Sequence, residues 1–314
     1  MIDIYKTNYD TGSLEKVDIL SKGCWINIVK PTKEEIESVA KNVGINEELL
    51  KYPLDISEKA HIDIENTEVL IVVDTPATVI KKDKKIYTTV PLGMIIVRDD
   101  IFITISQVKV NVIENIINCN KTNYIYTDKK SRFVFQILFD MAQDYIKYLT
   151  YISQDLDKFE ENLEKTVTNK ELLNIMNFEK TMIYFDASLK ANQIVLEKLN
   201  RGKTIKLYEE DEDILEDTLI ESKQAIEMLQ TYSQVLNGMI DVFGIVVSNK
   251  LNMVMKFLTS ITIIIAIPTM FASFLGMNVQ FPFSTNVDGF ILVMIVSIVF
   301  TILTTIWLKR KDMF

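Results

Sequence analysis

A stripe of polar and small residues runs along the C-terminal part of this 314-residue chain. Its members recur at alternating steps of three and four residues, a spacing that places them on one face of a helix. They are Asn252, Met255, Thr259, Thr262, Ala266, Thr269, Ser273 and Gly276. Small residues let membrane helices approach closely, so one interpretation is a helix-packing face. The other is the lining of a water-containing pore, which requires several copies of the chain because a single copy encloses nothing.

Side chains that carry catalysis or bind transition metals are scarce. His61 is the only histidine, and Cys24 and Cys119 are the only cysteines, so a zinc site of histidine and cysteine ligands cannot be assembled within one chain. We expect both cysteines to be buried thiols in a reducing compartment. Residues 1–200 contain no nucleophile motif, so we expect neither an enzyme nor a bound cofactor.

Two features bear on phosphate and nucleic-acid binding. Gly202-Lys203-Thr204 resembles the end of a phosphate-binding loop, but Glu197 occupies the position of the leading glycine. The segment therefore predicts a turn that ends a helix. The formal net charge of −9 argues against nucleic acid as a partner and is compatible with attracting cations.

Charge is distributed unevenly along the chain. Residues 257–287 contain no charged side chain, and after Asp288 a second uncharged run continues to Leu308. Crossing a bilayer takes about 20 predominantly apolar residues. Both runs meet this length, so we expect two membrane-spanning helices with the lipid bilayer as a partner.

Basic residues predict the orientation of these two helices. Lys250 and Lys256 precede the first, and Lys309, Arg310 and Lys311 follow the second, whereas the connecting segment has no Lys or Arg. The positive-inside rule then places both termini in the cytoplasm. The N-terminal residues show no export signal. We therefore expect a two-span protein of the cell membrane with a cytoplasmic N-terminal domain.

The N-terminal part predicts mixed α/β structure, half of an α/β/α sandwich. Apolar and β-branched runs predict strands at 24–29, 69–74, 88–98 and 101–106. Thr32 and Glu35 have the spacing of a capping box and predict the start of a helix.

The pattern changes to helical periodicity from Ser131, and no proline occurs until Pro268. We expect three long helices: one over 131–165, one from the cap Thr168 to Asn200, and one from Ile214 that continues without a break into the first span and ends near Gly276. At 1.5 Å per residue the third would be about 95 Å long. The predicted domains are 1–128 (α/β), 129–255 (long helices and stalk) and 256–314 (membrane).

The third helix ends in Gly276-Met277-Asn278, within the segment SNKLNMVMKFLTSITIIIAIPTMFASFLGMN. This segment resembles the first membrane helix of the CorA family of magnesium transporters. That family shares a Gly-Met-Asn signature at this helix end, a second span and a short basic C-terminus, all present here. WINIVKPTKEE also resembles the family's early strand and helix, so the resemblance covers essentially the whole chain.

The resemblance implies a homopentamer in which the first span lines a central pore. Asn278 of each subunit would form a polar ring at the outer mouth, next to Gly276 and Met277. Asn252, Met255, Thr269, Ser273 and Gly276 would face the pore, in agreement with the stripe. Mg²⁺ gives up its waters reluctantly, so neutral oxygens at the entrance suit a hydrated ion.

The resulting hypothesis is a channel-like importer of Mg²⁺ that is driven by the electrochemical gradient, with Co²⁺ and Ni²⁺ as alternative cargo. Two departures from the family pattern keep a zinc transporter of the same fold open: Leu275 replaces an aromatic residue, and the loop VQFPFSTN lacks an acidic one. A membrane-anchored scaffold is the alternative from a different class, but it would leave an Asn278 ring without purpose.

The family also has cytoplasmic acidic residues that bind Mg²⁺ at subunit boundaries and favour a closed pore. Asp217 falls at one such position. Its expected partner segment has Tyr52 and Pro53 instead of an acidic residue, and Asp55 is a possible substitute. The alternative is that Asp217 is an ordinary solvated charge.

Overall fold

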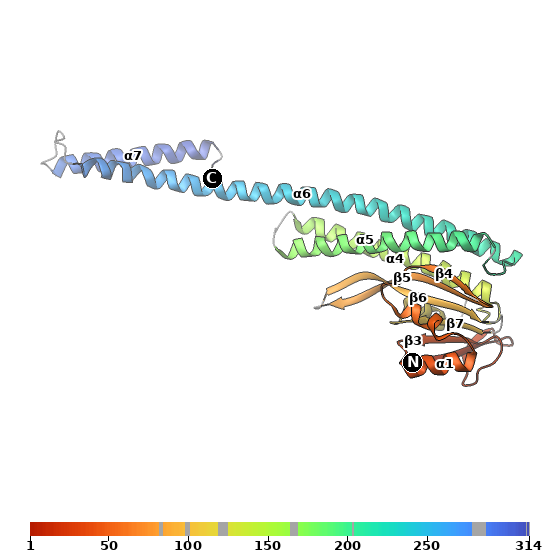
Figure 1. Cartoon of the computed structure of the whole chain (residues 1–314). Coiled ribbons are helices and arrows are strands. Elements are labelled where there is room, and N and C mark those ends of the chain that lie inside the picture. Colours follow the sequence, from red (N-terminus) through yellow and green to blue (C-terminus); the bar gives the residue numbers. More distant parts are fainter. Residues whose placement is uncertain are drawn as a thin grey trace. The chain divides into compact units, whose positions relative to one another are not determined.

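The computed structural model describes residues 1–81, 84–97, 101–118, 125–163, 169–202, 204–277, 287–311 and 313 (Figure 1). The chain forms two compact units, Met1–Gly238 and Met239–Phe314, called here the N-terminal unit and the C-terminal unit. Helix α6, Glu209–Leu275, begins in the first and ends in the second.

The described residues of the N-terminal unit form one seven-stranded sheet with the strand order β2-β1-β3-β7-β6-β5-β4. β3 and β7 are parallel, whereas the other neighbouring strands are antiparallel. The strands are β1 Ile2–Asn8, β2 Ser13–Lys16, β3 Trp25–Val29, β4 His61–Glu65, β5 Glu68–Lys81, β6 Lys84–Val97 and β7 Ile101–Ser106.

The four predicted strands are confirmed as β3, β5, β6 and β7. β5 and β6 are longer than predicted because they form one hairpin that stays in register from Val69–Ile96 to Lys81–Lys84. Strands β1, β2 and β4 were not predicted from the sequence. These strands lie at or near the sheet edges and contain only one to three apolar residues each, so their hydrophobic pattern is short.

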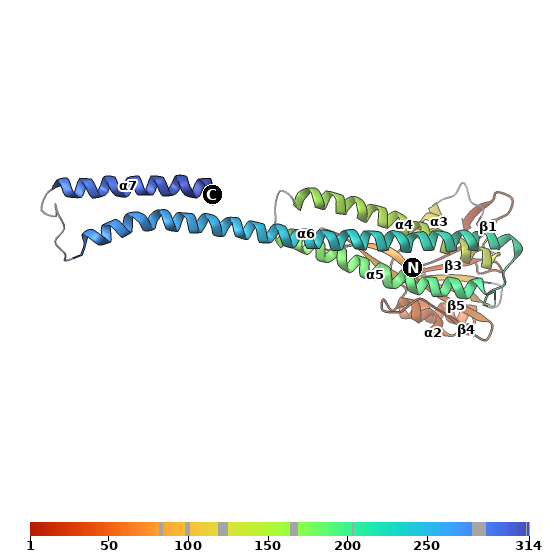
Figure 2. The same ribbon diagram turned by 90° about the horizontal axis from the view of Figure 1, so that it is seen from above.

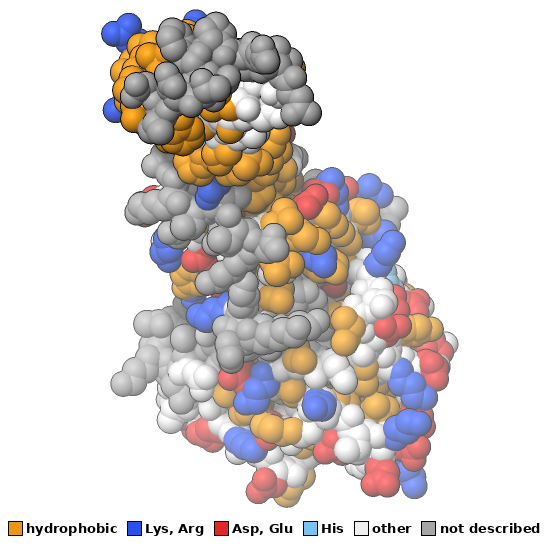
Figure 3. Space-filling view, turned by 90° about the vertical axis from the view of Figure 1, so that its left-hand side faces the viewer, with side chains coloured by type: hydrophobic (Ala, Val, Ile, Leu, Met, Phe, Trp, Pro, Cys, Tyr) orange, Lys and Arg blue, Asp and Glu red, His pale blue; other side chains and the backbone are white. Residues whose placement is uncertain are grey.

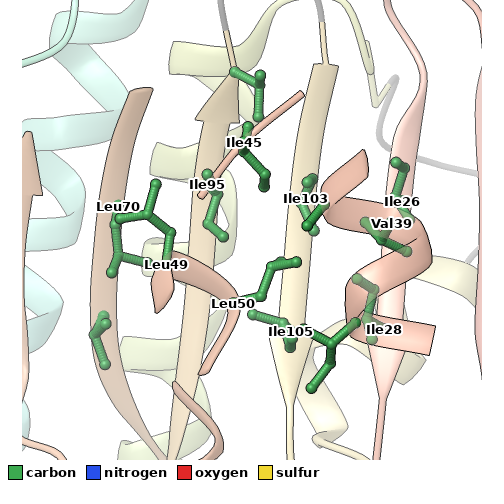
Figure 4. Packing of buried hydrophobic residues seen from close by; sticks show 14 of the residues in the cluster. Ile26, Ile28, Val39, Ile45, Leu49, Leu50, Leu70, Ile95, Ile103 and Ile105 are labelled. Atoms are coloured by element: carbon green, nitrogen blue, oxygen red, sulfur yellow. The ribbon is translucent and has the colours of Figure 1, made fainter. Parts of the chain in front are cut away.

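One face of the sheet is covered by α1 Lys33–Val43, α2 Glu47–Lys51 and the 3₁₀ helix η1 Tyr52–Leu54. The predicted capping box of α1 is confirmed, because Thr32 and Glu35 each accept a hydrogen bond from the other's backbone N–H. Aliphatic side chains of these helices and of the strands pack into a buried cluster (Figure 4). Full burial of one such side chain contributes about 1.5–3 kcal/mol.

The opposite face is covered by α4 Lys130–Leu163 and α5 Asn169–Asn200, and α3 Asn111–Asn118 packs against α4 (Figures 1 and 2). The N-terminal unit is therefore an α/β/α sandwich, as predicted. The two helices lie within two residues of their predicted ends, although the predicted cap Thr168 lies outside the described residues.

Asn192 of α5 forms hydrogen bonds with the backbone of β5, just beyond the last residue of β5 that pairs with β4. Its side-chain amide accepts a hydrogen bond from the Asp74 N–H at 2.9 Å and donates one to the Asp74 carbonyl at 2.7 Å. β4 pairs with β5 only as far as Val72, so Asn192 supplies the hydrogen bonds that a longer β4 would make.

Helix α6 begins at Glu209, five residues before the predicted Ile214, and runs unbroken through Pro268 to Leu275, as predicted. Its first part lies along α4 and α5 (Figures 1 and 2) and buries Leu215, Ala225 and Leu229. The C-terminal unit consists of the remainder of α6 and helix α7, Val287–Arg310.

Two carboxyl groups, Asp140 and Asp144, lie one turn apart on the packed part of α4. Asp144 is buried, and its Oδ2 atom has no hydrogen-bond partner among the described residues. Burial, with a further contribution from the Asp144 charge, raises the pKa of Asp140 to about 6. Burial also raises the pKa of Asp144, and the Lys147 ammonium partly offsets that rise. Ionisation of this pair therefore opposes folding.

Replacing Asp140 by asparagine should stabilise the N-terminal unit at neutral pH. The folded pKa lies above the unfolded value of about 4, so the opposition to folding is absent below that pH, grows as the pH rises to about 6 and is complete above it. We expect Asp140→Asn to gain about 1–2 kcal/mol at neutral pH, after allowance for solvent screening of this partly exposed group, and almost nothing near pH 4.

Urea unfolding of the full chain in detergent and metal-free buffer measures this difference. Trp25, which is fully buried in the N-terminal unit, reports the transition in a Trp307→Phe background that removes the second tryptophan. Asp157→Asn is the matched control, because Asp157 is an exposed carboxylate on the same helix. A gain for Asp140→Asn that is equal at both pH values would contradict the account.

Candidate ion pathway

The C-terminal unit is an antiparallel pair of apolar helices. By length and composition, α6 and the Gly289–Arg310 part of α7 could each cross a membrane. The Phe271 and Phe300 ring centroids lie 5.7 Å apart, and the Ser260 hydroxyl donates a 2.9 Å hydrogen bond to the Met313 carbonyl. Apolar side chains cover much of the visible surface of this pair, whereas charged side chains gather over the N-terminal unit (Figure 3). Such a surface suits contact with lipid or with other copies of the chain.

Seven members of the predicted stripe lie on α6, Gly276 follows its last residue, and all eight are exposed in the single chain. The opposite face of the helix packs on α7, because Ser260 is buried and Phe271 contacts Phe300. The stripe therefore faces away from α7. A shallow groove of about 490 Å³ follows it past Thr262, Ala266, Thr269 and Ser273.

The hydroxyl groups of the stripe bond to the backbone of their own helix. Thr262, Thr269 and Ser273 donate to the carbonyls of Leu258, Ile265 and Thr269 at 2.9, 2.9 and 2.8 Å. A hydroxyl that donates once still has lone pairs with which to accept a hydrogen bond. The groove thus presents neutral acceptor oxygens, which suit the water molecules around a hydrated cation and need no carboxylate.

The predicted entrance residues lie at the end of this helix. The Gly276 N–H bonds to the Ala272 and Ser273 carbonyls, both at 3.2 Å, and the Met277 N–H bonds to the Phe274 carbonyl at 3.3 Å. Met277 is exposed, and Asn278 lies outside the described residues. A Cβ at Gly276 would make only ordinary contacts, so the chain's own backbone does not demand glycine there.

The predicted regulatory residues are both exposed in the N-terminal unit. Asp55 follows η1 and accepts a hydrogen bond from the Ser57 N–H at 2.9 Å, whereas Asp217 lies in the third turn of α6. No hydrogen bond or ion pair between them is found among the described residues. Among the described residues, no group of three His, Cys, Asp or Glu side chains lies close enough to hold a metal ion. A cation bound by Asp217 would therefore need further ligands.

Pro53 has a packing role at the position where the resemblance predicts an acidic residue. It is buried against β6, and a Cβ added to Gly93 would lie only 2.2 Å from the Pro53 Cγ atom. Gly93 is thus the residue that admits η1 to the sheet surface. Pro53 therefore packs against the sheet instead of supplying a carboxylate. The exposed Asp55 is the nearby carboxylate.

The carboxylate pair Asp140 and Asp144 on α4 was not predicted from the sequence. The two carboxylates could contribute to holding a cation, with the remaining ligands supplied by water or by a second copy. Their i, i+4 spacing is visible in the sequence, but that spacing is common on solvated helix faces. Only burial and the unpartnered Oδ2 atom distinguish this pair.

Two known proteins resemble this chain in sequence. A "Cobalt/magnesium transport protein CorA" of Methanocaldococcus jannaschii is 28% identical over 292 residues, which cover 92% of this chain and 90% of the relative. The protein of the same description from Thermotoga maritima is 24% identical over 189 residues, 60% of this chain and 54% of the relative.

Solved structures show the same architecture. The complete structure of the CorA magnesium transporter from M. jannaschii superposes with a TM-score of 0.81 at 27% identity, covering 99% of this chain and 98% of that one. The full-length CmaX protein shares the fold, with a TM-score of 0.67 at 14% identity over 99% of this chain and 96% of its own. The model of the CorA-like Mg²⁺ transporter protein family matches residues 21–310. Because that match spans nearly the whole chain, the protein belongs to the CorA-like Mg²⁺ transporter family.

Proposed function

We propose that this protein imports Mg²⁺ down its electrochemical gradient through a pore lined by α6. The observation that carries the proposal is the exposed stripe of neutral oxygens on α6, which ends at Gly276-Met277-Asn278 in a member of this transporter family. The protein is thus a divalent-cation transporter of the CorA type and not an enzyme, and its cation is cargo and not a cofactor. Co²⁺ and Ni²⁺ are further candidate cargo.

The chemistry of the stripe favours a hydrated cation. Mg²⁺ demands nearly octahedral oxygen coordination and dehydrates reluctantly, so binding through its water shell avoids the cost of stripping it. Conduction also needs binding weak enough for release. Hydroxyl oxygens at Thr269 and Ser273, one turn apart, provide such weak successive contacts, and the Asn278 amide would provide the first of them.

The proposed pore needs several copies, and family resemblance suggests five. One chain presents one stripe, which stays exposed after α7 has packed on the other face of α6. Around a fivefold axis the stripe residues Asn252, Met255, Thr269, Ser273 and Gly276 would enclose water. In this arrangement the stripe would act both as a packing face and as a pore lining, because its small residues permit close helix contact and its oxygens line the path.

Orientation and driving force complete the proposal. We infer a cytoplasmic domain over 1–128, a stalk region over 129–255 and a membrane region over 256–314, with both termini in the cytoplasm because the basic residues flank the two spans on one side. An inside-negative potential supplies about 2.3 kcal/mol per charge per 100 mV, or about twice that for a divalent ion. Inward movement then requires no ATPase.

Replacing Asn278 by alanine should lower Mg²⁺ influx at least about tenfold, because a ring of amide oxygens at the entrance would be lost; tenfold corresponds to about 1.4 kcal/mol in the barrier. Influx into proteoliposomes, with Mg²⁺ or Zn²⁺ outside and with or without a proton gradient, measures both the rate and the preferred ion. Asn42→Ala is the matched control, because Asn42 is an exposed asparagine on α1. It should transport like the wild type.

The mass of each variant in detergent should correspond to five copies, which shows that a loss of influx is not a loss of assembly. A stable monomer or dimer would contradict the pore. Equal influx through Asn278→Ala and Asn42→Ala would remove Asn278 from the entrance, and faster influx of Zn²⁺ than of Mg²⁺ would identify a zinc transporter of the same fold.

We also propose that Asp217 helps to bind Mg²⁺ between subunits, with Asp55 or another carboxylate of a neighbouring copy, and so favours the closed pore. A ligand shifts such an equilibrium only by its differential affinity for the two states. Asp217→Ala should therefore need several-fold more Mg²⁺ for the same protection against limited proteolysis. Asp157→Ala is the control. Wild-type protein that is cleaved equally with and without millimolar Mg²⁺ would make Asp217 an ordinary solvated charge.

A further inference from the structure

Basic residues gather where the C-terminal end of α7 lies beside α6. They are called here the basic cluster and comprise Lys256 of α6, Lys309 and Arg310 of α7, and Lys311, which follows α7. All four residues are exposed, and all belong to the C-terminal unit. In the transport proposal their charges only set the orientation of the two spans.

One hydrogen bond brings the two parts of the basic cluster to the same level. The buried Ser260 hydroxyl donates to the Met313 carbonyl at 2.9 Å. Lys256 lies one turn before Ser260, and residues four apart share a helix face. The end of α7, where Leu308 is also buried, therefore lies beside the turn of α6 that carries Lys256 (Figures 1 and 2).

An exposed tryptophan adjoins these cations. Trp307 is 58% exposed, and Arg310 and Lys311 follow it by three and four residues, on the same side of the helix. The Lys311 N–H donates to the Trp307 carbonyl at 3.2 Å, so the helical geometry extends to Lys311. The Trp307 indole N–H has no hydrogen-bond partner among the described residues. It is free to donate to an oxygen beside the cations.

The charge of this region favours an anion. None of the four basic residues forms an ion pair within the described part of the chain. The sequence has no Asp or Glu over 242–287 or over 289–311. Asp312, which lies outside the described residues, is the only acidic side chain within ten residues of any member of the cluster. Four positive charges thus have at most one acidic neighbour along the chain.

Apolar side chains lead along α7 to these cations. Exposed residues recur on one face at steps of four, four and three: Val299, Leu303, Trp307 and Arg310. This face therefore changes from aliphatic to aromatic to cationic within three turns. Tryptophan favours the level of lipid headgroups, because its ring is apolar and its N–H can donate to a polar group.

A phospholipid matches this order of side chains better than a soluble anion does. Its acyl chain would contact the aliphatic part of the face, and its phosphate would meet the cations. A soluble phosphate would use the cations alone and leave the apolar line without a role. Basic pockets between membrane helices suit anionic headgroups, and α6 and Gly289–Arg310 are long and apolar enough to cross a membrane.

We propose that the basic cluster binds the headgroup phosphate of an anionic phospholipid. Arg310 can offer two parallel hydrogen bonds to phosphate oxygens, and the lysines act as point charges. The Trp307 indole N–H would add a further donor. The proposal goes beyond transport, since it requires only that the pair of α6 and α7 lies in a bilayer.

Trp307 itself reports the binding, because bromine atoms on acyl chains quench a nearby tryptophan. The full chain is reconstituted in vesicles of phosphatidylglycerol and phosphatidylcholine at one fixed ratio, with bromine on one lipid or on the other. Both leaflets have the same composition, so the direction of insertion does not matter. Trp307→Phe measures the constant emission of Trp25, which is fully buried in the N-terminal unit. We expect phosphatidylglycerol to be preferred at least about threefold at Trp307, and the preference to fall as NaCl is raised.

Variants test whether the two helices act together. Replacing Lys309, Arg310 and Lys311 by glutamine should remove the preference, and Lys256→Gln should lower it, although Lys256 lies on the other helix. Asp312→Asn should raise it by removing the nearby carboxylate. Lys180→Gln, at an exposed position of α5 in the N-terminal unit, is the matched control and should quench like the wild type. The mass of each variant in detergent shows that assembly is unchanged.

Equal quenching by the two brominated lipids in the wild type would overturn the proposal. So would an unchanged preference in the triple variant or in Lys256→Gln. Loss of the preference on adding inorganic phosphate at constant ionic strength would assign the basic cluster to a soluble anion, which also overturns it. No result depends on ion flux, so a failure here leaves the pore proposal intact.

Discussion

The continuity of α6 is the constraint on which the rest of the structure depends. Over 67 residues this helix must first pack on a soluble sandwich and then satisfy every backbone group in an apolar setting. Pro268 removes one N–H from the ladder, so the Ile264 carbonyl loses its usual donor. The hydroxyls of Thr262, Thr269 and Ser273 donate to other carbonyls nearby. The hydroxyl groups of the stripe thus have hydrogen-bond partners within α6 itself.

The same continuity links the two units through the backbone. The first turns of α6 are held against α4 by packing and ion pairs, and its last turns carry the groove of the proposed pore. A ligand that binds the N-terminal unit where that unit contacts α6 therefore acts on one end of this helix. This is how Mg²⁺ bound at Asp217, as we propose, would reach the membrane part of the helix.

Elements that carry a strong local pattern of residues could be predicted from the sequence. The capping box at Thr32, the apolar strands β3 and β7 and the unbroken helix into the first span follow from residue spacing. Strands β1, β2 and β4 were not predicted because each contains only one to three apolar residues, so the alternation in β1 and β4 is too short to stand out. The start of α6 was placed too late because its acidic first turn, which favours a helix N-terminus, has no apolar periodicity.

The candidate sites also divide into those that a local pattern predicts and those that depend on contacts between distant segments. The stripe was predictable because it lies on one helix with a regular period. The carboxylate pair on α4 depends on burial by other elements, and the packing role of Pro53 depends on Gly93 in β6. None of these non-local contacts is encoded in local spacing. Asn278, the entrance residue that the resemblance implies, lies outside the described residues and stays a prediction.

Cysteine accessibility tests the central claim, that the stripe of α6 faces the path of the ion. In a background without Cys24 and Cys119, Thr269→Cys and Ser273→Cys would be compared with Ile267→Cys, which lies on the opposite side of the helix. A charged, water-soluble thiol reagent should reduce Mg²⁺ influx at least about tenfold in the first two and leave the third unchanged, a difference of at least about 1.4 kcal/mol in the barrier. Block of Ile267→Cys alone, or equal influx of all three after treatment, would contradict a pore lined by this face of α6.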